Sequence, residues 1–149
     1  MNRFLSRRPY TLVLAAVVLL ALVSPAQAGT RPHDSRGSAQ FVNANDFVGG
    51  GTATHLGRYD EVGSVQISPT PDPTVFLVDA WATYTAANGD QLYAVMTGHL
   101  DGDTGAISAT VTYVGGTGRF TSASGTATLS AQLFPDGSIE VAVEGTINY

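Results

Sequence analysis

The chain has 149 residues, no cysteine and no lysine, and its 12 acidic residues outnumber its seven arginines, giving a formal net charge of −5 at pH 7. Without cysteine, disulfides and cysteine-based zinc or redox sites are excluded. The acidic balance argues against nucleic acid and anionic lipid as partners, because both are polyanions.

The first 28 residues predict an export signal. Arg3, Arg7 and Arg8 form a positive start, residues 12–23 are uncharged and apolar, and residues 26–28 (Ala-Gln-Ala) match a small-x-small cleavage site. The apolar run is shorter than the roughly 20 residues that span a membrane. We therefore expect cleavage after Ala28 rather than an uncleaved anchor.

The mature protein would be secreted or periplasmic, with no stable membrane span. It would keep four arginines and all 12 acidic residues, a net charge of −8. The Arg7-Arg8 pair leaves the general and the twin-arginine export routes both open.

After the signal, residues 29–39 are polar and predict a flexible lead-in, with His33 exposed to solvent. Residues 40–149 predict one β domain, because small and β-branched residues dominate and turn signals recur about every 10–12 residues. No helical period is found there. The strands predicted, in chain order, are 39–42, 51–59, 61–68, 74–86, 91–100, 106–114, 125–134 and 138–149.

Turn signals separate these strands. A proline-rich run ends the third, and Asn88-Gly89 predicts a tight hairpin because both residues accept positive φ. Residues 101–105 (Asp-Gly-Asp-Thr-Gly) resemble a calcium loop but lack its later acidic ligand, so a plain hairpin turn is the better interpretation. We expect no metal and no other cofactor.

The last strand alternates most cleanly. Ile139, Val141, Val143 and Ile147 share one face, and polar residues occupy the other. Strand 106–114 alternates in the same way. Such strands have one buried and one wet face, and a series of hairpins tends to close on itself because closure removes exposed edges. The sequence thus predicts an all-β closed antiparallel barrel, with a β-sandwich as the alternative.

A corner rich in glycine lies between strands 106–114 and 125–134. We expect Phe120 to turn inward and close one barrel end, because a lone aromatic in a polar loop gains most by burial. Arg119 would hydrogen-bond carbonyls of the irregular turn; the alternative is a cation at the barrel lip for an anionic ligand. Glycine would allow the unusual backbone of this corner at Gly115, Gly116, Gly118 and Gly125.

This corner resembles an element of the allene oxide cyclase and dirigent proteins, especially of bacterial secreted members of that barrel superfamily. Residues 51–58 and 87–92 are similar to further parts of the same group, and together the likeness spans about residues 49–149. The resemblance implies an eight-stranded antiparallel barrel. It also implies a lumen that shelters a reactive intermediate in plant members, and assembly into trimers in some. None of the plant catalytic residues can be placed on this sequence.

Three residues are candidates for catalysis. His55 would be a general base or an interior hydrogen-bond donor, against the alternative of a core or rim histidine. Arg58 lies three positions later and would face the other side of a strand, unless a bulge at Gly57 intervenes. If Asp79 faced inward, it would be a buried carboxylate with a raised pKa. His55, His99 and a carboxylate make only a poor metal site.

Four residues are candidates for ligand binding. Trp81 shares a strand face with Asp79, and the sequence leaves open whether that face lines the lumen or lies outside, where Trp81 could serve an oligomer interface. Tyr84 and Tyr93 flank the Asn88-Gly89 turn and are expected to close a barrel end, with ligand contact as the alternative. Arg119 is the fourth candidate.

No convincing catalytic set emerges. The favoured hypothesis is a secreted, non-catalytic barrel that holds a small apolar ligand in its lumen or acts as an interaction module, with a homodimer or homotrimer as a candidate assembly. The alternative is a cyclase or isomerase that acts by confining its substrate.

Overall fold

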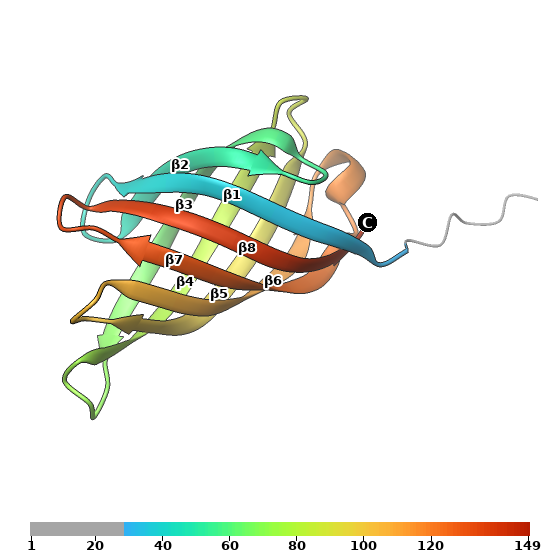
Figure 1. Ribbon diagram of the computed structural model, residues 1–149. Coiled ribbons are helices and arrows are strands. Elements are labelled where there is room, and N and C mark those ends of the chain that lie inside the picture. The colour runs from blue at the N-terminus through green and yellow to red at the C-terminus, as the bar shows by residue number, and fades with distance from the viewer. Residues whose placement is uncertain (1–28) are drawn as a thin grey trace, which may run out of the picture.

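The structure is a computed structural model that describes residues 29–149, so the predicted export signal and its cleavage site lie outside the described residues. Eight antiparallel strands close into one barrel, each pairing with its neighbours in sequence and β1 pairing with β8 (Figure 1). The strands are β1 (Arg31–Phe41), β2 (Asp46–Ala53), β3 (Gly57–Pro69), β4 (Val75–Ala86), β5 (Gln91–Asp101), β6 (Ala106–Gly116), β7 (Ser124–Leu133) and β8 (Ser138–Asn148). A short 3₁₀ turn, η1 (Gly118–Phe120), is the only helical element of the described part. The predicted barrel is confirmed, and the sandwich alternative is wrong.

The first strand corrects the predicted lead-in. Residues 31–39 are not flexible: they form most of β1, which pairs with β2 on one side and with β8 on the other, from Arg31 opposite Ile147 to Gln40 opposite Ser138. Without β1 the barrel would have two open edges. The sequence hid this strand because its inward residues (His33, Ser35, Gly37 and Ala39) are small or polar rather than large and apolar.

The predicted strand 51–59 is also wrong, because a turn divides it. β2 ends at Ala53, residues 54–56 turn, and β3 begins at Gly57, whose φ of +66° favours glycine. Asn88-Gly89 likewise forms a longer turn than predicted. Gly89 alone has a positive φ there, and the backbone N–H of Ala86 donates to the Asp90 carbonyl at 2.9 Å.

Alternation along the other strands is confirmed by burial. On β8, Ile139, Val143 and Ile147 are buried, and on β6 Ala109, Val111 and Tyr113 are buried. On β4 the inward face carries Val78, Ala82 and Tyr84, so Asp79 and Trp81 face outward. Gly63 leaves room for the ring of Phe47, which a Cβ at this position would meet.

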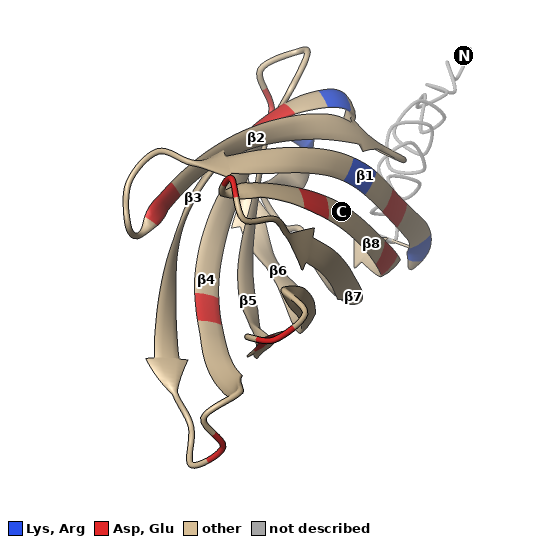
Figure 2. Ribbon diagram, turned by 60° about the vertical axis from the view of Figure 1, so that its left-hand side comes forward, with Lys and Arg blue, Asp and Glu red and all other residues tan. Residues whose placement is uncertain are grey.

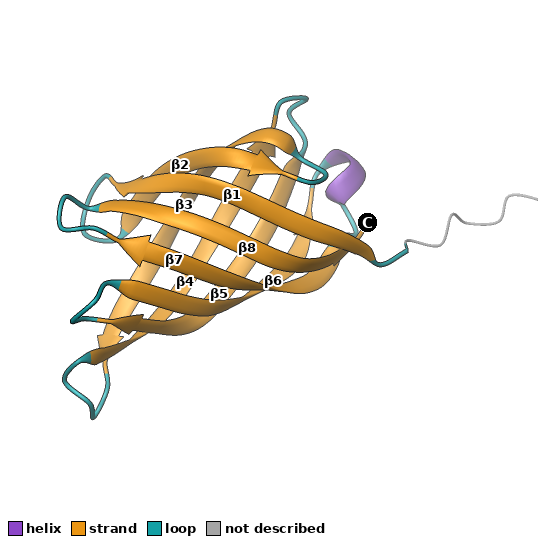
Figure 3. Cartoon of the chain, viewed as in Figure 1, coloured by secondary structure: helices purple, strands orange, loops and turns teal. Residues whose placement is uncertain are grey.

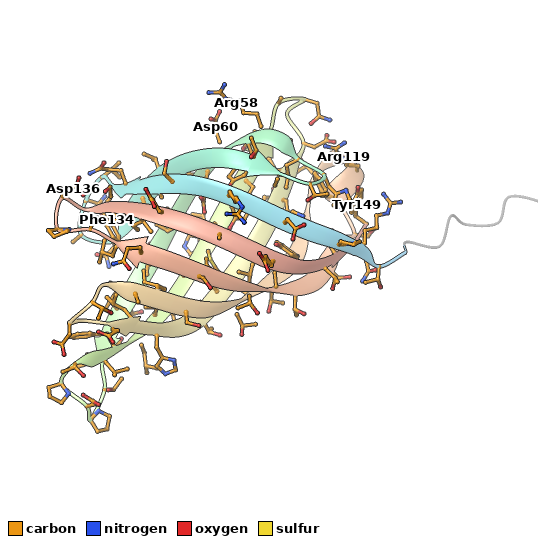
Figure 4. All side chains as sticks on the ribbon, viewed as in Figure 1. Arg58, Asp60, Arg119, Phe134, Asp136 and Tyr149 are labelled. Atoms are coloured by element: carbon orange, nitrogen blue, oxygen red, sulfur yellow. The ribbon has the colours of Figure 1, made fainter. Side chains whose placement is uncertain are left out.

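The barrel has two unlike ends. Four hairpin turns (residues 42–45, 70–74, 102–105 and 134–137) surround one end, which carries Phe134 and Asp136 (Figure 4). At the other end lie η1, the C-terminus and the start of β1, with Arg119 and Tyr149 (Figures 3 and 4). We call these the hairpin end and the η1 end.

Candidate functional site

Phe120 closes the η1 end. Its side chain is fully buried, and its ring centroid lies 5.0 Å from that of Tyr149. The turn that inserts it needs unusual backbone angles, and Gly115 and Gly118 supply them with φ of +112° and +54°. The predicted plug is confirmed.

Arg119 fastens this plug to the neighbouring turns. Its Nη2 donates to the carbonyl of His55 at 2.7 Å, its Nε lies 3.6 Å from a carboxylate oxygen of Asp90, and its guanidinium covers the Phe120 ring at 4.9 Å. The predicted hydrogen bond to a turn carbonyl is confirmed. Because Arg119 lies outside the sealed end, it does not line the lumen.

Below the plug, the interior is polar and aromatic. Ser35 and Tyr59 share a hydrogen bond of 2.9 Å between their hydroxyls, and the Tyr59 and Tyr84 rings meet edge to face at 5.4 Å. The His33 ring meets that of Tyr113 in the same manner at 5.2 Å. The cavity left in this layer is only about 10 Å³, close to the minimum for one water molecule. The layer is packed nearly solid.

His33 is buried, not exposed as predicted. It is 2% exposed, and its Nδ1 is the one buried side-chain polar atom within residues 29–149 that has no hydrogen-bond partner. Burial lowers the pKa of His33 to about 4, helped by the nearby His55 and opposed by Asp34. His33 is therefore neutral at neutral pH.

Glu61 marks the boundary of the polar layer. It is 9% exposed and lies directly opposite the buried Tyr84 in the β3–β4 pairing. Burial raises its pKa from 4.5 to about 7, and the neighbouring Tyr84 hydroxyl only partly opposes this. Near neutral pH the carboxyl can thus either donate or accept a proton.

Above Glu61 the lumen is hollow. The cavity has a volume of about 80 Å³ and lies at the hairpin end, where Ile67 on its wall is 42% exposed. Glu61 is the sole ionisable residue among the described residues that line it. The rest of the wall is apolar, with Phe41, Phe47, Val78, Met96, Leu129 and Val141 among its residues.

The three predicted catalytic residues do not meet. His55 lies on the β2–β3 turn, where its Nε2 is 2.8 Å from the Pro32 carbonyl oxygen, and its ring stacks 6.0 Å from His33. Arg58 projects from the outer surface near Asp60 (Figure 4), and Asp79 is exposed on the outer face of β4. None of the three lines the lumen cavity.

The predicted ligand-binding residues separate in the same way. Tyr84 faces the interior and contacts Glu61, whereas Trp81 and Tyr93 face outward. Tyr93 was expected to close a barrel end; instead its hydroxyl donates to Gln91 at 3.0 Å on the outer surface. The strand register decides this, because Leu92 and Ala94 on either side of Tyr93 are buried.

The calcium-like turn is a hairpin held by its own side chain. Asp101 Oδ1 accepts the backbone N–H groups of Asp103 and Thr104, both at 2.9 Å. Over residues 29–149 no group of three or more His, Asp or Glu side chains is placed to hold a metal ion. The same range contains no helix long and apolar enough to cross a membrane.

Sequence reasoning missed Glu61 and His33. Glu61 lies on the same strand face as Tyr59, Gly63 and Val65, all of which point inward. A predicted strand that began at Gly57 instead of Glu61 would have shown this alternation. His33 gave no apolar signal, because its strand has almost no large inward residue.

Comparison with protein-family models, with curated proteins and with solved structures gave no match to this chain. The resemblance to the allene oxide cyclase and dirigent barrels therefore stays a prediction. A fold alone does not determine a function, so the function is inferred from the lumen itself.

Proposed function

We propose that the protein binds a small apolar ligand in its lumen, entered from the hairpin end. The observation that carries this is the hollow, apolar-walled cavity above Glu61 in a barrel whose opposite end is sealed by Phe120. A barrel interior that served only stability would be filled with side chains, because voids cost packing energy.

The cavity volume restricts the ligand. Pockets for drug-sized molecules measure roughly 300–1,000 Å³, whereas this one measures about 80 Å³. A slender apolar group, such as the end of an alkyl chain, suits it better than a fused ring system. Glu61, on the wall of this cavity, would offer the buried end of the ligand one hydrogen-bonding position.

Filling the lumen tests this proposal. Val141→Phe places a ring on the cavity wall, and Val95→Phe is its control, because Val95 lies on the outer face of β5 at 42% exposure. We expect the protein and the control to bind 1-octanol by calorimetry, and Val141→Phe to lose binding by about tenfold or more. Equal binding by both variants, or none by the wild type, would refute lumen binding.

A cyclase or isomerase is the second candidate, and Glu61 is the observation that favours it. A carboxyl with a pKa near 7 in an apolar enclosure is suited to general acid–base chemistry. Glu61→Gln separates the two functions once a substrate is found: a binding protein keeps its ligand, whereas an enzyme keeps binding but loses turnover.

Export with cleavage after Ala28 is part of the proposal. Its support is the charge and apolar pattern of residues 1–28. Amino-terminal sequencing of the secreted protein should begin at Gly29, and native mass spectrometry of the same sample would report both assembly into dimers or trimers and any retained ligand.

A further inference from the structure

Trp81 lies on the outside of the barrel with no aromatic partner among the described residues. It is the single tryptophan of the chain, and its side chain on β4 is 52% exposed. An indole gains most by burial, so one left uncovered at the middle of a strand is a feature that a binding partner would explain.

The groups around Trp81 are small and mixed in polarity, with the exposed Val62 and Val95 among them. Its cross-strand neighbours are Ser64 on β3 and Val95 on β5, and its neighbours along β4 on the same face are Asp79 and Thr83. One row further toward the hairpin end, Gln66, Asp79 and Thr97 lie side by side on three adjacent strands. A shallow groove runs over this region.

Beyond Trp81, the outer faces of β6 and β7 have hydroxyl groups and no charged side chain. β6 and β7 contain no Asp, Glu, Lys or Arg, and Figure 2 shows both ribbons in tan with no red or blue band. The pairing places threonines in two parallel rows across β5 to β8. One row runs from β5 to β7 through Thr97, Thr110 and Thr128 and meets Glu144 on β8. The other runs from β6 to β8 through Thr112, Thr126 and Thr146.

We propose that this outer face binds a neutral saccharide chain, with Trp81 as the stacking platform and Gln66, Asp79 and Thr97 as hydrogen-bond partners of sugar hydroxyls. A pyranose ring has one face of C–H groups that packs on the electron-rich face of an indole. Its hydroxyls at the ring edge need donors and acceptors, which amide, carboxylate and threonine side chains provide. The threonine rows extend this surface for further sugar units.

A second copy of the chain fits the face less well. The core of a protein interface is depleted of charged residues and built on clustered large side chains. Here three of the four nearest outward neighbours of Trp81 are Ser64, Asp79 and Thr83. Each copy of the predicted mature chain also has a net charge of −8, which opposes self-association.

Trp81 fluorescence tests the proposal directly, because the chain has no other tryptophan. The purified protein is titrated with cellohexaose, xylohexaose and mannohexaose, and its retention is measured on microcrystalline cellulose and chitin. We expect saturable binding of at least one glycan, with a shift of the Trp81 emission, and a loss of about tenfold or more in Trp81→Ala. Asp79→Asn and Thr97→Val should weaken binding by smaller factors.

Phe134→Ala is the matched control. Phe134 is also an exposed aromatic, at 37%, but it lies at the β7–β8 turn rather than on the face around Trp81. Its loss should leave glycan binding unchanged. Failure of the wild type to bind any of these glycans, or equal binding by Trp81→Ala, would overturn the proposal. A dimer in sedimentation that Trp81→Ala dissociates would assign the face to self-association and overturn it equally.

Discussion

The two halves of the barrel interior are built from the same alternating strands but differ in content. The half at the η1 end is packed with polar and aromatic side chains and leaves about 10 Å³ free, whereas the half at the hairpin end is apolar and leaves about 80 Å³. The packed half carries the stability and seals the barrel, which allows the other half to stay hollow. Glu61 lies where the two halves meet: it is opposite Tyr84 of the packed half and lines the cavity of the hollow half.

Removing the plug should have the largest effect. Phe120→Ala leaves a cavity at the most buried point of the η1 end, and we expect a loss of about 3–5 kcal/mol in the free energy of unfolding. Phe134→Ala, at the hairpin end, should cost about 1 kcal/mol or less. Urea denaturation measures both, and equal losses would show that the two ends do not differ in this way.

Glu61→Gln should have the second largest effect on the free energy of unfolding, and this effect should depend on pH. The folded-state pKa of Glu61 is raised from 4.5 to about 7, so the folded protein binds more protons than the unfolded chain between these values. Its contribution to stability therefore falls as pH rises through this window. We expect Glu61→Gln to be more stable than wild type by about 3 kcal/mol at pH 8 and equal to it at pH 4.

Glu140→Gln is the control for this measurement. Glu140 is exposed on the outer face of β8, so its substitution should change stability little at either pH. A Glu61→Gln variant whose advantage did not grow with pH would show that the carboxyl is not held in an apolar environment.

His33 should have the opposite effect to Glu61 on the pH dependence of stability. Its folded-state pKa is lowered to about 4 from 6.5, so here the unfolded chain binds more protons and stability falls as pH drops from 6.5 toward 4. The loss should be on the order of 2 kcal/mol after allowance for solvent screening. In the Glu61→Gln background, adding His33→Phe should flatten this slope and leave only the loss at lower pH from aspartates with lowered pKa, such as Asp72 and Asp101. Persistence of the slope at higher pH would assign it to other groups.

Arg119→Ala should have the smallest effect. It removes the hydrogen bond to the His55 carbonyl and the cover over Phe120, and we expect a loss of about 1 kcal/mol. Arg58→Ala is the matched control, since Arg58 projects from the outer surface (Figure 4). Thermal unfolding measures both. A loss of stability in Arg119→Ala no larger than that in the control would show that Arg119 does not stabilise the closed η1 end.

The N-terminal and C-terminal parts of the chain differed in how far sequence could predict them. Strands from residue 74 onward were predicted nearly to their ends, and Phe120 was placed correctly, because large apolar residues alternate there between strong turn signals. β1 and the β2–β3 turn were missed, because His33, Ser35 and Gly37 carry no apolar pattern and the glycines of β2 do not mark its end. Glu61 was missed because the predicted strand began at Glu61 instead of Gly57, which hid its alternation with Tyr59 and Gly63.

The NMR signal of one methyl group, that of Met96, tests most directly whether the lumen binds an apolar ligand. After cleavage at Ala28, Met96 would be the one methionine of the protein, and it lies on the cavity wall, while Trp81, the one tryptophan, lies outside. In protein labelled at the methionine methyl and the indole N–H, titration with 1-octanol should shift the NMR signal of Met96 to saturation and leave that of Trp81 in place. An unmoved Met96 signal at saturating alcohol would contradict the account.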